Sequence, residues 1–290
     1  MIHWSAHLSV LFTEHTPLAR PEVAAAAGFA LVESWWPPAE DLDAWVDAVQ
    51  TAAVGVSCLN ADGGDIASGE RGFCNVPERD HDTFAAVHAA LALAEQVGCP
   101  NVNLLPGLVL EERPVHEQLD HAVGVYRQCG DLAAASGRVI VIESINAIDV
   151  PRYLLPTPVA VASFLTRVNH PNVRMLFDAY HCARGGGDPA GDVDTFGHLF
   201  GHAQYADCPG RGAPGTGDVD LAAFVAALTT AGYDGAVGLE YNPGGPTEPT
   251  LGFIGADAGI SRLARGAGRH TPQQRLHPRG SGRRSRPSRS

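Results

Sequence analysis

Apolar residues run without interruption into an acidic residue in the segment VIVIESIN, residues 139–146. Four β-branched residues precede Glu143, and such a run predicts a parallel strand that is covered on both faces. The carboxylate of Glu143 is then delivered at the end of a buried strand. An unpaired charge is costly there unless a metal, a partner charge or a substrate compensates it. The alternative is that Glu143 has already left the strand and is solvated.

Three later segments repeat this design. They are VRMLFDAYH (173–181), GHAQYAD (201–207) and GAVGLEYN (235–242). The repetition favours buried strands with functional side chains at their ends over a solvated Glu143.

Eight predicted strands alternate with helical segments along the chain. The strands are expected at residues 7–12, 31–36, 54–59, 101–105, 139–146, 173–180, 201–207 and 236–242. The helices are expected at residues 17–27, 41–53, 80–98, 115–137, 159–169, 193–200 and 221–231. Alternating units predict a parallel sheet and eight strands close it, so the fold class is α/β, a (β/α)8 TIM barrel. An eighth helix should follow residues 247–254, but several glycines weaken it.

The charge of the chain divides it at residue 261. Among the 290 residues all 20 basic ones are Arg; eleven Arg accompany 32 Asp and Glu in residues 1–261, and the other nine follow without any acid. We therefore predict a barrel domain at 1–261 and a disordered basic tail, rich in Arg, Pro, Ser and Gly, at 262–290. A body this acidic is poorly suited to a phosphate backbone, so no nucleic-acid partner is expected and a small solute is favoured.

The six cysteines lack any C-x-x-C spacing, which disfavours zinc-finger and disulfide scaffolds. The sequence shows no signal peptide and no apolar run near 18 residues, so we expect a cytoplasmic protein with free thiols and no membrane contact. Without Lys, a lysine Schiff base is excluded.

Four oxygen-bearing side chains are expected at the same level of the barrel. Active sites of this architecture lie where the strands end, and the last four predicted strands bring Glu143, Asp178, Gln204 and Glu240 to that level. Their oxygens indicate a hard cation, Mg²⁺ or Mn²⁺, rather than zinc. Each one alone has another explanation, since Asp178 could cap a helix, Gln204 could satisfy a buried backbone group and Glu240 could pair with an arginine.

Two glutamates beside such a cation suit proton transfer at a carbon next to a carbonyl. One carboxylate removes the proton and the other returns it on the neighbouring carbon, which is aldose–ketose isomerisation, or epimerisation if the proton returns to the opposite face. His181 and His202 lie in the same motifs and could donate to a substrate oxygen, although a lone histidine in a strand is commonly a core residue. Arg71 and Arg211, in glycine-rich loops, could receive a substrate carboxylate.

A family resemblance follows from six segments: HLSVLFTE, GDIASGERG, IESINAIDVPRYLL, FDAYH, HAQYADCPGRGAPGTGD and GLEYNPGGPTE. In colinear order over residues 3–254, they resemble the hydroxypyruvate isomerase family of the xylose-isomerase-like barrels. The resemblance implies interconversion of hydroxypyruvate and tartronate semialdehyde, or of related oxotetronates. It implies Glu143 and Glu240 as proton donor and acceptor, and Glu143, Asp178, Gln204 and Glu240 as ligands of a divalent ion that need not be obligatory.

Several positions depart from the family pattern around these residues: Ser144, Ala183, Gly212, Ala213 and Asn242. An epimerase or isomerase of a neutral sugar, or a catalytically inactive small-molecule-binding barrel, therefore stays open beside the isomerase of a hydroxy-oxo acid. A lesion endonuclease is disfavoured by the acidic body. The sequence also leaves a homodimer open.

Overall fold

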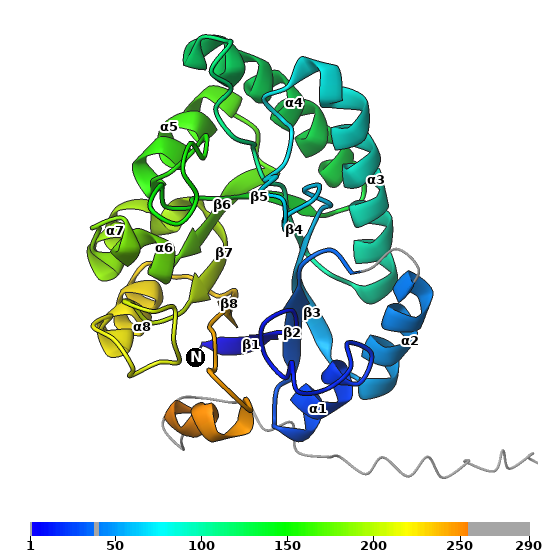
Figure 1. Cartoon of the computed structure of the whole chain (residues 1–290), viewed down its shortest axis with the longest axis vertical. Helices are drawn as coiled ribbons and strands as arrows, with labels where there is room; N and C mark the ends of the chain where they lie inside the picture. The colour runs from blue at the N-terminus through cyan, green and yellow to red at the C-terminus, as the bar shows by residue number, and fades with distance from the viewer. Residues whose placement is uncertain (1, 38–40, 255–290) are drawn as a thin grey trace, which may run out of the picture.

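The computed structural model describes residues 2–37 and 41–254, and these form a closed ring of parallel strands with helices outside it (Figure 1). The strands are β1 (His3–His7), β2 (Leu31–Ser34), β3 (Gly55–Asn60), β4 (Asn101–Asn103), β5 (Val139–Glu143), β6 (Val173–Asp178), β7 (Phe200–Tyr205) and β8 (Ala236–Leu239). They follow one another around the ring, and β8 pairs with β1 to close it. The predicted (β/α)8 barrel is thus confirmed.

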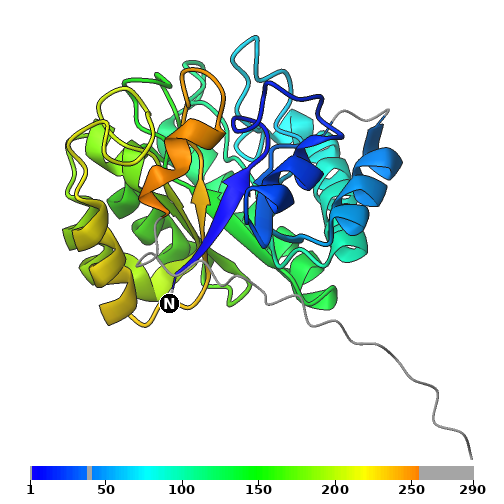
Figure 2. The same ribbon diagram turned by 90° about the horizontal axis from the view of Figure 1, so that it is seen from below.

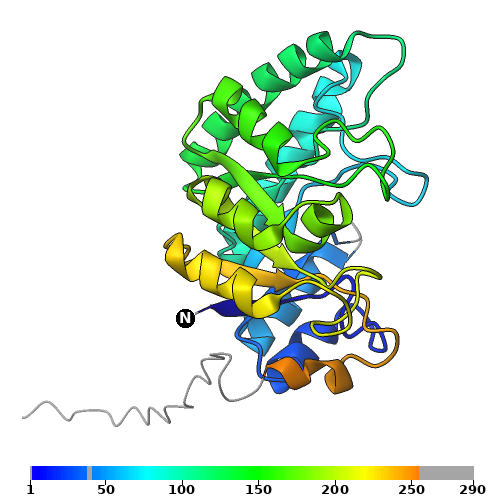
Figure 3. The same cartoon turned by 90° about the vertical axis from the view of Figure 1, so that its left-hand side faces the viewer.

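The helices cover the outside of this ring. They are α1 (Arg20–Ala26), α2 (Leu42–Ala52), α3 (Asp80–Val97), α4 (Val115–Ala135), α5 (Pro158–Val168), α6 (Ala179–Arg184), α7 (Pro189–Phe196) and α8 (Leu221–Thr230), with short 3-10 helices η2 (Pro77–Arg79), η3 (Gly197–Leu199) and η4 (Glu248–Phe253). Figures 2 and 3 show the long loops gathered at one end of the barrel, toward which the strands point. No helix of residues 2–37 and 41–254 combines the length and apolarity needed to cross a membrane.

Alternation along each strand separates the large apolar core beneath the helices from the side chains inside the barrel. On β5, Ile140 and Ile142 belong to the large core beneath the helices, whereas Val141 belongs to a separate cluster with Cys58 and Leu176. Because successive side chains of a strand point to opposite faces, Glu143 shares the inner face with Val141. By the same alternation, Asp178 at the end of β6 shares the inner face with Leu176 and lies at the barrel mouth.

The first strand was predicted wrongly at residues 7–12. It runs from His3 to His7, and the apolar residues that follow form a turn over the barrel mouth. Phe12 is fully buried there against Phe29, and its backbone N–H donates to Thr247 Oγ1 at 2.6 Å. The residues after His7 are apolar because they are buried in this turn, and the same apolar pattern had indicated a strand.

Other boundaries also differ from the predicted ones. The helix expected at 193–200 is α7, Pro189–Phe196, and β7 already begins at Phe200. β6 ends at Asp178, whose carboxylate accepts from the backbone N–H of Tyr180 at 2.7 Å and so begins α6 inside the segment expected to be a strand. The chain after β8 forms η4 instead of a full helix, and Phe253 of η4 packs edge-on against Trp4 with ring centroids 6.0 Å apart. The predicted tail, 262–290, and the domain boundary at 261 lie outside the described residues.

Candidate active site

A cavity of about 570 Å³ opens at the carboxyl ends of the strands. One wall carries Glu143, His181, Arg211 and Glu240, and the remaining lining comes mainly from apolar side chains and from the loop after β3. The two predicted catalytic glutamates therefore line one cavity, although they lie far apart in the sequence.

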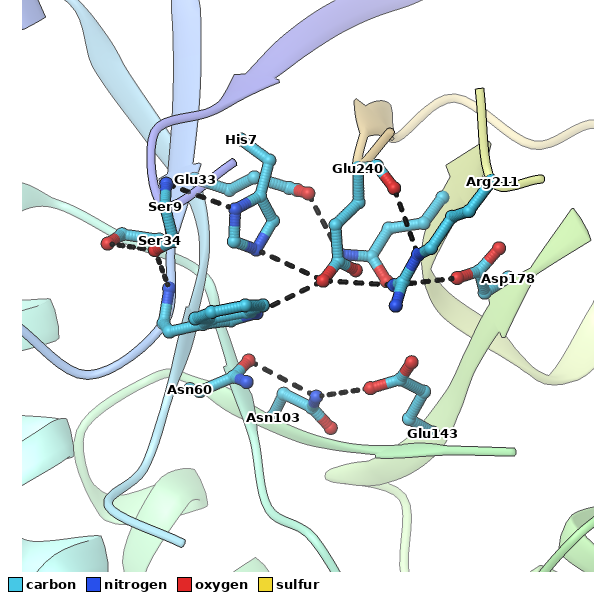
Figure 4. Close-up of polar contacts among 12 residues, drawn as sticks. His7, Ser9, Glu33, Ser34, Asn60, Asn103, Glu143, Asp178, Arg211 and Glu240 are labelled. Carbon is cyan, nitrogen blue, oxygen red and sulfur yellow. Dashed lines mark hydrogen bonds and ion pairs between the residues drawn. The ribbon is translucent and has the colours of Figure 1, made fainter. Parts of the chain in front are cut away.

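The carboxylates of Glu143, Asp178 and Glu240 surround a common space in this mouth (Figure 4). Their side chains are 5%, 0% and 4% exposed respectively, so water does little to stabilise their charges. Arg211 is the guanidinium that contacts this group. Three acids therefore share one permanent positive charge.

Arg211 lies closer to Glu240 than to Asp178. Its Nη2 lies 3.1 Å from Glu240 Oε1 and 3.7 Å from Asp178 Oδ2 (Figure 4). The same Glu240 oxygen accepts from Trp35 Nε1 at 3.0 Å and lies 3.8 Å from His7 Nε2. Burial alone would raise the pKa of Glu240, but Arg211, His7, His181 and the Trp35 hydrogen bond lower it below its ordinary value.

Glu143 and Asp178 have the opposite electrostatic balance. Burial and then repulsion from Glu240 and Asp178 raise the pKa of Glu143 well above its ordinary value, despite a 3.0 Å hydrogen bond from Asn103 Nδ2. Burial raises the pKa of Asp178 to about 7, although Arg211 opposes the shift. Arg211 therefore compensates the charge of Glu240, whereas Glu143 and Asp178 are left with too little positive charge beside them.

The same place could hold a divalent metal. Ligand atoms of Glu143, Asp178 and His181 lie within 4.8 Å of one another. Asp178 Oδ2 and Gln204 Oε1 are buried and receive no hydrogen bond from the residues that the structure describes, and these two residues are register partners on β6 and β7. A hard cation would satisfy both oxygens and the missing charge, so the donor set fits Mg²⁺ or Mn²⁺. Glu240, the fourth predicted ligand, already has one oxygen occupied by Arg211 and Trp35.

His181 is oriented by Asn146. The Oδ1 atom of Asn146 accepts from the backbone N–H groups of Ile148 and Asp149, at 3.1 and 2.9 Å, so its Nδ2 must face the imidazole. That Nδ2 lies 2.7 Å from His181 Nδ1, which therefore accepts, and the ring proton is on Nε2. Burial, together with Arg211, lowers the pKa of His181 to about 3, so the ring is neutral. In this arrangement Nε2–H points as a donor toward Glu143 and Asp178, at 3.6 and 3.8 Å.

Gln204 and His202 lie deeper than the cavity. His202 is fully buried and is not among the cavity-lining residues; its Nε2 lies 2.5 Å from Glu33 Oε2. Gln204 Nε2 donates to the other oxygen of Glu33 at 2.8 Å. The structure thus places His202 outside the cavity lining, with its Nε2 on Glu33, a residue that no sequence pattern singled out.

The two predicted arginines, Arg71 and Arg211, differ in whether acids pair with them. Both line the cavity, but Arg211 is held by Glu240 and Asp178. Arg71 donates through Nη1 to the backbone oxygens of Ile66 and Glu70, and no acid pairs with it within residues 2–37 and 41–254. Arg71 is therefore the cavity cation that can accept a substrate carboxylate without losing an ion pair.

The departures from the family pattern lie away from the cavity wall. Its lining includes none of these five residues within the described chain: Ser144, Ala183, Gly212, Ala213 and Asn242. In contrast, His7, Trp35 and Asn103 touch the central acids and were not singled out from the sequence. They are neutral or aromatic residues near strand ends, which are ordinary in a core, so only the fold reveals their role.

The closed ring of eight parallel strands, with an oxygen-rich cluster at the carboxyl ends, defines the class of (β/α)8 barrels. The chain belongs to the xylose isomerase-like TIM barrel family, whose model matches residues 21–256. Within it, the chain is a member of the hydroxypyruvate isomerase and 2-oxo-tetronate isomerase family, as its relatives show.

Three relatives illustrate the similarity. The chain is 36% identical to the "Putative hydroxypyruvate isomerase" of Streptomyces coelicolor, over 89% of this chain and 98% of the relative. It is 32% identical to the 2-oxo-tetronate isomerase of Cupriavidus necator, over 88% of this chain and 98% of that protein. A solved structure, AP endonuclease, family 2 from Brucella melitensis, has a TM-score of 0.84 and 30% identity, covering 88% of this chain and 98% of that one.

Proposed function

We propose that this protein is an aldose–ketose type isomerase of a small hydroxy-oxo acid, with hydroxypyruvate and tartronate semialdehyde as the first pair to test. The observation that carries the proposal is the composition of the cavity. Two buried glutamates with opposed pKa shifts line it together with Arg71, a cation that no acid of the described chain neutralises. Pairs of titratable groups whose environments separate their pKa values are typical of acid–base catalysis.

Each charged group then has a task. Arg71 holds the carboxylate of the substrate, and His181 donates its Nε2–H to a substrate oxygen. Glu240, whose lowered pKa keeps it ionised, removes the proton from the hydroxyl-bearing carbon. Glu143 returns a proton to the neighbouring carbon, and the hydroxyl proton passes to the former carbonyl oxygen, so the carbonyl and hydroxyl exchange places without any redox partner. Proton exchange with solvent then restores the two glutamates.

Glu143, Asp178 and Gln204, with the free oxygen of Glu240, would hold a divalent cation, Mg²⁺ or Mn²⁺. When bound, such an ion withdraws charge from the substrate oxygens and makes the adjacent C–H more acidic. The chain's own contribution is the orientation of the substrate between two glutamates and the exclusion of water by the apolar wall.

A four-carbon acid is the second candidate, because the cavity of about 570 Å³ has room beyond a three-carbon ligand. The related 2-oxo-tetronate isomerases bear that substrate class in their names. We do not extend the endonuclease name of the Brucella structure to this chain, since the cavity lining carries two arginines beside four acids and so lacks the clustered cations that a phosphate backbone requires.

The test is a metal-supplemented assay of the full chain with hydroxypyruvate, 2-oxo-tetronates and neutral ketoses. The proposal predicts conversion of one of the acids and at least tenfold slower conversion of any neutral ketose of similar size. Comparable rates on neutral ketoses, or no turnover of either acid, would contradict it.

A further inference from the structure

A second polar layer lies beneath the cavity and centres on Glu33. Glu33 is 1% exposed, and its carboxylate accepts from Gln204 Nε2 at 2.8 Å, contacts His202 Nε2 at 2.5 Å and lies 3.4 Å from Ser57 Oγ. A buried carboxylate requires such partners to remain ionised. Among the described residues, the hydrogen-bond partners of this carboxylate lie on β3 and β7, so this side chain of β2 reaches across the inside of the barrel.

Two small residues make this crossing possible. β8 and β1 lie between β7 and β2 in the ring, and at the crossing level they carry Gly238 and Ser5, which are register partners. A Cβ at Gly238 would overlap the Glu33 carboxylate, so only glycine leaves the space. The barrel interior is therefore shaped to bring the acid of β2 to the amide of β7.

The contact determines which end of the Gln204 amide remains free. An amide donates only through nitrogen and accepts only through oxygen, and Glu33 as a carboxylate accepts. Gln204 Nε2 is therefore bound to Glu33 and Oε1 is the other end, which is buried and has no donor. Asp178, the register partner of Gln204, also has a buried oxygen without a donor.

From this geometry we infer that Glu33 is a positioning residue for the cation site: it holds the Gln204 amide with its oxygen, and not its nitrogen, toward the cation. His202 and Ser57 hold the Glu33 carboxylate in turn. Residues that orient metal ligands from behind typically change metal affinity by about 10- to 100-fold when they are removed. The inference rests on the cation part of the proposed function and is independent of the identity of the substrate.

The test is a double-mutant cycle on Mn²⁺ affinity, measured by calorimetry on the metal-free full chain. Glu33→Met removes the acceptor at similar length, Gln204→Met removes the ligand, and the third protein carries both changes. If Glu33 acts through Gln204, each single variant binds Mn²⁺ about 10- to 100-fold more weakly, and the double variant is no weaker than Gln204→Met. Glu14→Gln, a matched change at an exposed glutamate that accepts from Thr247 N, should leave the affinity unchanged.

An affinity of Glu33→Met within twofold of the wild-type value would overturn the inference, as would fully additive losses. Circular dichroism and metal-free melting establish that each variant is folded. If Glu33→Met does not fold, a crystal structure of the wild-type protein with Mn²⁺ decides, because the anomalous signal locates the ion. An ion beside Gln204 Oε1, with Nε2 still on Glu33, supports the inference, and an ion remote from Gln204, or no Mn²⁺ binding at all, overturns it.

The inference and the proposed function fail separately. A protein that shows this pattern of Mn²⁺ affinities but converts no hydroxy-oxo acid would support the role of Glu33 and contradict the isomerase. A protein that converts hydroxypyruvate while Glu33→Met binds Mn²⁺ normally would do the reverse.

Discussion

The two halves of the barrel supply different parts of the cavity. Strands β5 and β6 end on Glu143 and Asp178, Glu240 directly follows β8, and the loop after β7 contributes Arg211. The first half contributes mainly neutral groups that touch these acids, such as Trp35 and Asn103. The late half therefore carries the acids and the arginine at the centre of the site, and the early half adds hydrogen bonds to two of these acids.

The largest expected effect comes from neutralising the late half. Glu143→Gln and Glu240→Gln each keep the shape of the side chain but remove its capacity for proton transfer, so kcat should fall about 10²- to 10⁴-fold. The measurement is the initial rate on the hydroxy-oxo acid that the wild-type protein converts. Glu111→Gln, at an exposed acid paired with Arg152, is the matched control and should keep the wild-type rate. A full rate in either active-site variant would remove the acid–base roles.

The Arg71→Met variant tests whether the early half contributes a positive charge that binds the substrate. Arg71→Met should raise KM for a carboxylate substrate about 10- to 100-fold, because a charge-assisted hydrogen bond contributes about 1.5–3 kcal/mol, and kcat should change less. Arg152→Met, at an exposed arginine, serves as control. An unchanged KM in the Arg71 variant would show that the carboxylate binds elsewhere.

The pH dependence of cation binding tests the charge imbalance within the late half. Burial raises the pKa of Asp178 to about 7 and the pKa of Glu143 well above its ordinary value, so the metal-free folded protein holds protons that the unfolded chain releases above about pH 4. Metal-free stability should therefore fall as pH rises from about 4 to 7. The lowered pKa of Glu240 acts in the opposite direction only at lower pH.

A cation that takes Asp178 as a ligand displaces its proton, so Mn²⁺ affinity should rise by up to about tenfold per pH unit below pH 7. Calorimetry between pH 6 and 8 in buffers of different ionisation enthalpy measures both the affinity and the protons. An affinity that does not change with pH would mean that these carboxylates are already ionised without the metal.

The smallest expected effect comes from removing the hydrogen bond that Trp35, in the early half, donates to Glu240. Trp35→Phe removes the Nε1–H donor and leaves Arg211 in place, so kcat should fall by about 3- to 10-fold, with the acid limb of the pH–rate profile moved to higher pH. Trp36→Phe is the matched control, because Trp36 also lines the cavity and makes no hydrogen bond to the described residues. Equal profiles for both variants would remove Trp35 from the account.

The same division explains what the sequence could predict. A carboxylate at the end of an apolar run is rare without a partner, so Glu143 and Asp178 were recognisable, although both strands end earlier than predicted, at these two residues. His7 and Asn103 resemble ordinary polar residues, and their importance depends on which strand lies opposite, which no local pattern encodes. The apolar run after His7 even indicated the wrong strand, because burial under a loop and burial in a sheet select the same residues.

The central claim is that hydrogen moves between two carbons as a proton carried by glutamates. It is tested most directly by following hydroxypyruvate conversion in heavy water by NMR, with the wild-type protein, Glu143→Gln and Glu240→Gln. The account predicts that the wild-type protein forms tartronate semialdehyde with solvent deuterium on its hydroxyl-bearing carbon, and that neither variant does so at a comparable rate. Rapid conversion with the substrate hydrogen fully retained at that carbon would contradict it, because the hydrogen would then have moved as a hydride without the two glutamates.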